Sequence, residues 1–436
     1  MKNNPTVKII GGGLAGTEAA LYLAKRGVKV KLFDIKPNKF TPAHGSKNFA
    51  ELVCSNSLKS NDVFGNAAGL LKEEMRRLGS SVIAAADKTA VPAGNALAVD
   101  REKFSDLLTE ELTSNPNIEI ISEEVEKIDD DGITVIATGP LTTGNLNGEI
   151  EKIAGGKLSF FDASAPIVSF ESIDLDHAFF GDRYNKGNGD HLNLPINKEE
   201  YLAFYDALVS AERAKLHEFE KTEVFEGCMP IEVMAARGVD TLRFGPLKPA
   251  GLDDPKTGRW PYACLQLRKE DEEGNCYNLI GFQTNLTFGE QKRVFSIIPA
   301  LKNAEYLRYG VMHRNTFINS PEILNRDFSV RDRESVYFAG QITGVEGYVE
   351  SAASGLMAAI YIYLKLKGKK PEYISEYTVI GSLIRYITTA NKDFQPMNAN
   401  FGIIPKLDIK DKAARKKETA TRSLICVGQF IKENEL

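Results

Sequence analysis

A cluster of glycines near the start of the chain has the spacing of a dinucleotide-binding loop. Its six residues are Gly11, Gly12, Gly13, Leu14, Ala15 and Gly16. The first glycine permits a tight turn, the third lets the backbone approach a pyrophosphate, and the last lets a helix pack closely on a strand. Asp34 follows Gly16 by 18 residues, where a carboxylate can accept hydrogen bonds from ribose hydroxyls. The pattern predicts a dinucleotide bound at a helix N-terminus, whose N–H groups face the phosphates.

A second glycine-rich segment lies far along the chain, from Gly340 to Gly347, after the apolar stretch Val336–Ala339. A helix of small residues is predicted to follow it from Tyr348. A simple NAD-dependent dehydrogenase does not need this second segment, whereas the flavin end of FAD lies far from the first loop and needs its own cradle. We therefore predict FAD as the cofactor. Its further contacts are predicted to be Thr138, Gly139, Gly340, Gln341, Gly347 and Tyr348.

Five cysteines complete the set of residues that could do chemistry: Cys54, Cys228, Cys264, Cys276 and Cys426. Their number is odd and no two have a CxxC spacing. This disfavours a disulfide framework and a structural zinc site, and it predicts thiols in a reducing compartment. We predict no metal site.

Positioning these residues requires an α/β fold. The stretches Val7–Ile10, Thr17–Arg26 and Val28–Phe33 predict a strand, a helix and a second strand, which form a βαβ unit around the first glycine loop. The apolar stretch Ile133–Ala137 predicts another strand of the same sheet, which ends at Thr138. This domain is expected to be a Rossmann-like FAD-binding domain of the glutathione-reductase-like class.

The middle of the chain has a different character. It is richer in turn signals, and Tyr262–Leu267 and Tyr277–Phe282 alternate in polarity, which favours antiparallel hairpins. We predict an inserted α+β domain at 185–305. The FAD-binding domain then comprises 1–184 and 306–436, and the second part ends in a basic tail.

The bulk composition limits the partners and the location. The chain has 436 residues and a net charge of −5, so contact with a nucleic acid must come from a local basic patch. The first residues lead directly into a strand, and we expect no signal peptide. No apolar run is expected to reach the ~20 residues of a membrane span. We predict a cytoplasmic protein without membrane association and without a stable protein partner.

Several segments together resemble one family, the folate- and FAD-dependent tRNA (uracil-5-)-methyltransferases called TrmFO. The matching segments are GGGLAGTEAA, FAELVCSNSLKS, LKEEMRRL, VPAGNALAVDR, FEGCMPIEVMAARG, YGVMHRNTFINSP, FAGQITGVEGYVESAASG and FQPMNANFG. They extend over nearly the whole chain. Asp34 stands where many members carry glutamate, and this change keeps a carboxylate for the ribose.

The resemblance implies a reductive methylation. 5,10-Methylenetetrahydrofolate donates the carbon, reduced FAD supplies the electrons and NAD(P)H restores the reduced flavin. The product is 5-methyluridine in the T-loop of tRNA. It also implies that Tyr348 either stacks on the flavin or folate ring or packs in the core. Glu346 and Glu350 are candidate polar contacts or helix caps.

Two cysteines lie in matching segments and are candidates for catalysis. Uracil C5 is a poor nucleophile until a group adds to C6, and a thiolate is suited to that addition. Cys228 precedes a helix predicted to start at Pro230, where the partial positive charge favours a thiolate. We predict Cys228 as the nucleophile. Cys54 is predicted to act in proton transfer or positioning, or as a second nucleophile, and the other three cysteines are expected to be structural.

Three rival functions remain open at this stage. The same chemistry would serve a uridine of 23S ribosomal RNA, a flavoprotein could reduce a small acceptor with NAD(P)H, and a flavin-bearing module could bind RNA without turnover. Candidate contacts to RNA phosphates or to bound rings are Lys59, Arg76, Arg77, His313, Arg314 and the basic tail Lys406–Arg422.

Overall fold

The computed structural model describes residues 6–41, 43–129, 131–142, 144–156, 158–185, 187–214, 229–391 and 394–436. The side chains of 158–163, 313 and 314 are not among the described parts. The predicted nucleophile Cys228 lies outside the described residues, as do the side chains of His313 and Arg314.

The first sheet is mainly parallel and carries the first glycine loop. Its strands have the order β16-β17-β7-β1-β2-β6, and every neighbouring pair is parallel except β16 and β17. The strands are β1 (Val7–Ile10), β2 (Val30–Phe33), β6 (Ile118–Ile121), β7 (Thr134–Ile136), β16 (Ser329–Val330) and β17 (Arg333–Phe338). The strand predicted at 336–339 therefore returns to the sheet beside β7. The prediction of a Rossmann-like α/β fold is confirmed.

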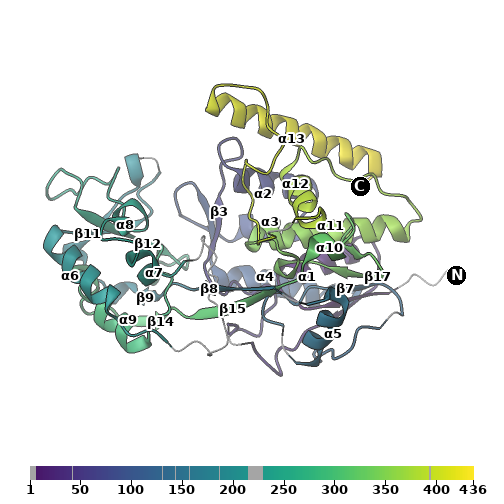
Figure 1. Ribbon diagram of the computed structural model, residues 1–436, viewed down its shortest axis with the longest axis horizontal. Helices are drawn as coiled ribbons and strands as arrows, with labels where there is room; N and C mark the ends of the chain where they lie inside the picture. The colour runs from purple at the N-terminus through teal and green to yellow at the C-terminus, as the bar shows by residue number, and fades with distance from the viewer. Residues whose placement is uncertain are drawn as a thin grey trace.

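Alternating side chains bury both faces of this sheet. Val7 and Ile9 of β1 belong to the core shared with helices α1 (Leu14–Lys25) and α11 (Tyr348–Leu366), whereas Ile10 belongs to a second core on α5 (Asn145–Ala154). A parallel sheet covered by helices on both faces needs such continuous apolar strands. Figure 1 shows α1 and α11 on one side of these strands and α5 on the other.

Helices α1 and α11 approach each other closely at Gly355. A Cβ atom built on Gly355 would lie 2.2 Å from the carbonyl oxygen of Ala15, so only glycine fits there. Helix α11 is 19 residues long and by length and composition alone is apolar enough to cross a membrane. However, 83% of its apolar window is buried inside the protein, as is typical of a core helix.

The second sheet is antiparallel and has its own core. Its strands have the order β10-β11-β12-β13-β9-β14. They are β9 (Ile167–Ser169), β10 (Phe179–Phe180), β11 (Leu192–Ile196), β12 (Ala263–Lys269), β13 (Cys276–Leu279) and β14 (Tyr306–Arg308). Helices α6 (Lys198–Val209), α7 (Ile231–Ala235) and α9 (Phe288–Phe295) contribute buried residues to this core. β12 and β13, which overlap the two alternating stretches, pair as an antiparallel hairpin.

Two linking strands, β8 (Leu158–Ala163) and β15 (Met312–Phe317), pair antiparallel between the two sheets. Figure 1 shows this pair running from the part with the parallel sheet to the part with α6, α9 and β11. Since β9 and β10 precede residue 185 and belong to the second sheet, we propose that the insertion extends from 164 to 311 instead of the predicted 185 to 305.

The remaining elements complete the part with the parallel sheet and the insertion. They are β3 (Ser57–Ser60), β4 (Ala90–Val91), β5 (Ala96–Val99), α2 (Ala67–Arg77), α3 (Ser81–Lys88), α4 (Arg101–Thr113), α8 (Thr241–Phe244), α10 (Ser320–Ile323), α12 (Val379–Thr388) and α13 (Lys412–Asn434). Buried carboxylates fix two helix starts among them: Glu18 accepts hydrogen bonds from Ser81 N and Val82 N, and Glu74 accepts from Val379 N and Ile380 N.

Candidate functional site

The first glycine loop joins β1 to α1 and leaves one open side. A Cβ on Gly11 would lie 2.5 Å from the oxygen of Ala137, and a Cβ on Gly16 would lie 1.8 Å from the oxygen of Gly11. Neighbouring backbone therefore requires glycine at both positions. A Cβ on Gly13, the N-cap of α1, would meet no protein atom within 4 Å. The open side of the loop thus lies where a ligand phosphate could approach the first N–H groups of α1.

Asp34 lies beside this loop, directly after β2. Its Oδ2 accepts a hydrogen bond of 2.7 Å from Gly12 N, and its Oδ1 accepts one of 2.8 Å from Lys36 N. These contacts orient the carboxylate and shape the loop at the same time. Each oxygen keeps a further lone pair, so the group can still accept hydrogen bonds from a ribose.

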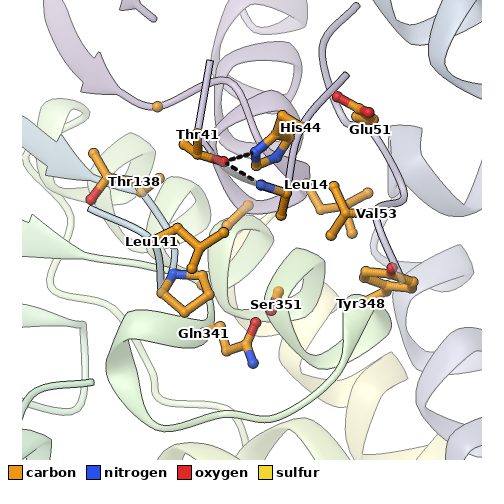
Figure 2. Close-up of a pocket in the computed structure, with 18 of the residues that line it drawn as sticks. Leu14, Thr41, His44, Glu51, Val53, Thr138, Leu141, Gln341, Tyr348 and Ser351 are labelled. Atoms are coloured by element: carbon orange, nitrogen blue, oxygen red, sulfur yellow. Dashed lines mark hydrogen bonds between the residues drawn. The ribbon is translucent and has the colours of Figure 1, made fainter. Parts of the chain in front are cut away.

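One cavity of about 450 Å³ unites the predicted residues. Its lining includes Gly11, Gly12, Gly13, Leu14, Ala15, Asp34, Cys54, Thr138, Gly139, Gly340, Gln341, Gly347 and Tyr348. Gly16 is not in the lining but packs beneath it on Gly11. Figure 2 shows Leu14, Thr138, Gln341 and Tyr348 around this cavity.

The two glycine loops touch each other. A Cβ on Gly340 would lie 3.1 Å from the Cβ of Ala15, so the second loop continues the wall that the first begins. Ser164 and Gln283 line the same cavity from the side of the insertion. A long ligand with a pyrophosphate at Gly13 would thus extend past Gly340 toward Tyr348, which fits the shape of a flavin dinucleotide.

Tyr348 holds the loop that carries Cys54. Its hydroxyl oxygen accepts hydrogen bonds from Cys54 N at 2.6 Å and from Ser55 N at 3.2 Å. Burial raises the pKa of the Tyr348 hydroxyl, so this group stays protonated. The ring lines the cavity while the hydroxyl fixes the backbone at Cys54, a contact that the sequence did not predict.

The insertion holds the same loop from the other side. Arg268 of β12 donates from Nη2 to Ser55 Oγ at 2.7 Å and from Nε to Asn56 Oδ1 at 2.9 Å. The Asn56 amide in turn donates to Lys269 O at 2.7 Å. The position of Cys54 therefore depends on both parts of the molecule.

Sequence reasoning missed a polar cluster of Thr41, His44 and Glu51 that lines the cavity (Figure 2). His44 Nδ1 and Thr41 Oγ1 lie 2.6 Å apart, and Glu51 Oε1 accepts hydrogen bonds from Gly45 N and Ser46 N. Burial lowers the pKa of His44, which favours its neutral imidazole. The available signal was the set of polar residues between β2 and β3, of which Thr41 and His44 precede the FAELVCSN segment and Glu51 belongs to it.

Glu346 and Glu350 lie near the second glycine loop. Glu346 Oε2 accepts a hydrogen bond of 2.7 Å from Gln341 Nε2. Glu350 Oε1 accepts from Lys59 Nζ at 2.8 Å and from Ala399 N at 2.9 Å. Lys59 lines the cavity, so this ion pair contributes to the cavity wall near the second glycine loop.

The other predicted phosphate contacts are partly engaged within the protein. Arg76 pairs with Asp87 at 2.7 Å and Arg77 with Glu73 at 3.2 Å. In the basic tail, Lys416 of α13 donates to a backbone oxygen of Gly65, whereas Lys417 is exposed. These contacts dock α13 on the part with the parallel sheet and leave only some of its charges toward solvent.

Two further cysteines, the buried Cys264 and the partly buried Cys276, have surroundings that disfavour a thiolate. Burial raises the pKa of Cys264 to about 12, and burial together with Asp271 raises that of Cys276 to about 12. Neither thiol forms a thiolate near neutral pH, which suits a structural role. Near Cys228, the predicted helix begins one residue later than expected, with Pro230 as the N-cap of α7.

Known proteins resemble this chain over almost its full length. The family described as "Glucose inhibited division protein A" (GIDA) matches residues 6–370. The methylenetetrahydrofolate–tRNA-(uracil-5-)-methyltransferase TrmFO of Acetivibrio thermocellus is 56% identical over 429 residues, 98% of each chain. The protein of the same name from Lactobacillus gasseri is 55% identical over 434 residues, 99% of each chain.

Among solved structures, Aquifex aeolicus GidA in its form I crystal superposes with a TM-score of 0.71. The superposition covers 98% of this chain and 76% of that one, at 16% sequence identity. At this identity the likeness establishes the fold alone.

Proposed function

Since the chain belongs to the TrmFO family of methylenetetrahydrofolate–tRNA-(uracil-5-)-methyltransferases, we propose that it methylates C5 of a uridine in the T-loop of tRNA. 5,10-Methylenetetrahydrofolate is the carbon donor and NAD(P)H the reductant. The methylene carbon forms a bond to uracil C5, a hydride equivalent reduces it to methyl, the C5 hydrogen leaves as a proton and tetrahydrofolate is released. FAD, when bound, supplies the redox step between NAD(P)H and the one-carbon unit.

The convergence of two glycine loops and the Cys54 loop on one cavity is the observation that carries this proposal. Gly13 and the N-terminus of α1 would hold the pyrophosphate, and Asp34 the ribose. Gly340, Gln341 and the residues ahead of Tyr348 would cradle the flavin end. The open space at Gly13 supports this fit, because a side chain there would occupy the path of the phosphates.

The thiols are proposed to activate the base. Cys228 adds to uracil C6 and makes C5 nucleophilic, and Cys54 accepts or returns a proton, positions the base or serves as a second nucleophile. Arg268 and Arg308 both interact electrostatically with Cys54, and positive charge beside a thiol stabilises its thiolate form. Tyr348 fixes the backbone at Cys54, so the thiol has a defined place beside the cavity.

The sequence has one complete dinucleotide fingerprint, which we assign to FAD. NAD(P)H is therefore proposed to dock transiently at the cavity, without a domain of its own. We place the activity in the cytoplasm, where tRNA and folate meet.

A single assay tests the proposed function against its rivals. Purified protein is incubated with 5,10-methylenetetrahydrofolate, NAD(P)H and either an unmodified tRNA transcript or a 23S rRNA fragment, and the nucleosides are then analysed. We expect 5-methyluridine in tRNA, dependent on the folate. Methylation of the rRNA fragment alone would select the ribosomal substrate. NAD(P)H oxidation without any methylated nucleoside would select the reductase, and RNA binding without turnover the binding module.

Trapping with RNA that contains 5-fluorouridine assigns the thiols, because fluorine at C5 blocks completion and leaves the protein attached at C6. We expect a covalent adduct on a peptide that contains Cys228, and its loss in Cys228→Ala with FAD and NAD(P)H oxidation retained. An adduct on Cys54 that persists in Cys228→Ala would exchange the two roles. Cys264→Ala is the matched control, since its thiol is fully buried and does not line the cavity.

A further inference from the structure

Three arginines and one glutamate gather beside Cys54 at the boundary of the two parts. Arg101 comes from α4, Arg268 and Glu270 from the second sheet and its following turn, and Arg308 is the last residue of β14. The charge of Glu270 acts on all three guanidinium groups. The cluster thus holds one carboxylate against three positive charges.

Two of these arginines form an ion pair or hydrogen bonds within the protein. Arg101 Nε lies 2.6 Å from Glu270 Oε2, and its Nη1 donates to Leu52 O at 3.0 Å. Arg268 is 8% exposed and donates to Ser55 and Asn56. Both therefore hold the Cys54 loop or its surroundings.

Arg308 differs from both. Within the described residues, its guanidinium group has no hydrogen-bond or ion-pair partner, although it is only partly exposed and interacts electrostatically with Cys54 and Tyr348. Burial and the nearby charge of Arg101 lower the pKa of Arg308. A half-buried charge without a partner is unfavourable until an anion binds to it.

We propose that Arg308 binds a backbone phosphate of the RNA substrate, the one on the 5′ side of the target uridine. The inference rests on the proposed function and deepens it, because it assigns a substrate contact in the charged cluster beside Cys54, which lines the cavity. In an anti pyrimidine nucleotide the 5′-phosphate lies on the C6 edge of the base. The thiols that act on this edge of the base and a cation that reaches this phosphate must therefore lie on the same side of the uridine. Arg308 meets this requirement because it belongs to the charged cluster around Cys54, the second thiol of the proposed mechanism.

The surroundings of Arg308 favour RNA over a small carboxylate. Tyr309 follows it in the chain, and the Tyr309 ring stacks between Tyr306 and Phe288, with centroids 5.2 and 4.7 Å away and planes tilted by 8° and 15°. The outer ring, Phe288, is 54% exposed. Sites for single-stranded nucleic acid combine cations for phosphates with such aromatic faces for bases.

A double-mutant cycle between protein and RNA tests this contact. The RNA is a T-arm hairpin, either natural or with one neutral methylphosphonate linkage on the 5′ side of the target uridine. Wild type and Arg308→Gln are titrated with both over a range of salt concentrations, with FAD content recorded. Arg293→Gln is the matched control: it removes an arginine from the same part of the chain, but one already paired with Glu290 at 2.6 Å.

Losing the contact should weaken RNA binding about tenfold and reduce the salt slope by about 0.7. We expect this in Arg308→Gln with natural RNA and in wild type with the neutral linkage. Arg308→Gln combined with the neutral linkage should weaken RNA binding little more than either change alone. The KM for methylenetetrahydrofolate and the FAD content should stay unchanged, and Arg293→Gln should behave as wild type.

Additive losses in the cycle, or wild-type RNA affinity in Arg308→Gln, would overturn the proposal. A raised KM for the folate with an unchanged salt slope would also overturn it and assign the anion to the folate carboxylates. If Arg308→Gln does not fold, binding of the RNA with the neutral linkage to the wild-type protein tests the contact alone. An affinity equal to that for natural RNA would refute it. Failure of wild type to methylate any RNA would instead refute the proposed function.

Discussion

Gly13→Ala should separate FAD binding from folding. Gly13 has φ −72° and ψ −172°, which alanine adopts without strain, and its Cβ would meet no protein atom within 4 Å. We therefore expect the unliganded variant to lose less than ~1 kcal/mol of stability, because alanine is only a poorer N-cap than glycine. The added methyl group points into the cavity where the phosphates would approach.

The expected effect on FAD follows from the hydrogen bonds at this loop. A backbone N–H that donates to a charged phosphate contributes about 1.5–3 kcal/mol, which corresponds to about 10- to 150-fold in affinity. A methyl group that holds the pyrophosphate away from Gly13 should remove at least one such bond. Gly13→Ala should thus be purified with little FAD and be nearly colourless.

The contrasting variant is Gly16→Ala, whose Cβ would lie 1.8 Å from the oxygen of Gly11. It should be destabilised even without ligand, because the loop itself must shift. Thermal unfolding of the FAD-free proteins and fluorescence titration with FAD measure the two effects separately. FAD affinity equal to wild type in a folded Gly13→Ala protein would refute the placement of the pyrophosphate.

Three further predictions concern neighbouring groups. Asp34→Asn should retain the fold and weaken FAD binding about tenfold. The amide has only one acceptor oxygen, which Gly12 N, Lys36 N and a ribose would have to share. Titration with flavin measures the affinity. Tyr348→Phe should leave Cys54 N and Ser55 N without their acceptor and speed the alkylation of Cys54, measured by mass spectrometry, with Tyr361→Phe as the control. Burial raises the pKa of Glu74 from 4.5 to about 7, so its contribution to stability is full below pH 4.5 and is lost as the pH rises to about 7. Glu74→Gln should flatten the pH dependence of thermal stability in this window by about 3 kcal/mol, and an unchanged profile would contradict the assignment.

The local parts of the fold were predictable because neighbouring residues determine them. The βαβ unit follows from a buried strand, a glycine turn and an alanine-rich helix in immediate succession. The return of β17 was predictable because its apolar run and the following glycines repeat that pattern. Cys54, Asp34 and both glycine loops were therefore identified from short segments, and the structure brings them to one cavity.

Contacts between distant segments were not predictable from these patterns. Tyr348 and Cys54 are separated by 294 residues, and Arg268 and Ser55 by 213, so no local spacing indicates their hydrogen bonds. The earlier boundary that we propose for the insertion rests on β9 and β10, which are only three and two residues long. Such short strands show no alternation of polarity before their partners are known.

The order of the strands in the parallel sheet also determines when the protein can acquire its cofactor during synthesis. β7 is made early, but its outer neighbour β17 is made almost 200 residues later, after the entire insertion. Gly355, which packs on Ala15, emerges later still. A nascent chain that ends before α11 therefore carries the first glycine loop without its second wall, and its apolar sheet edge at β7 stays uncovered. We expect chaperones to shield the ribosome-bound N-terminal half from aggregation. Cofactor loading should follow the completion of α11.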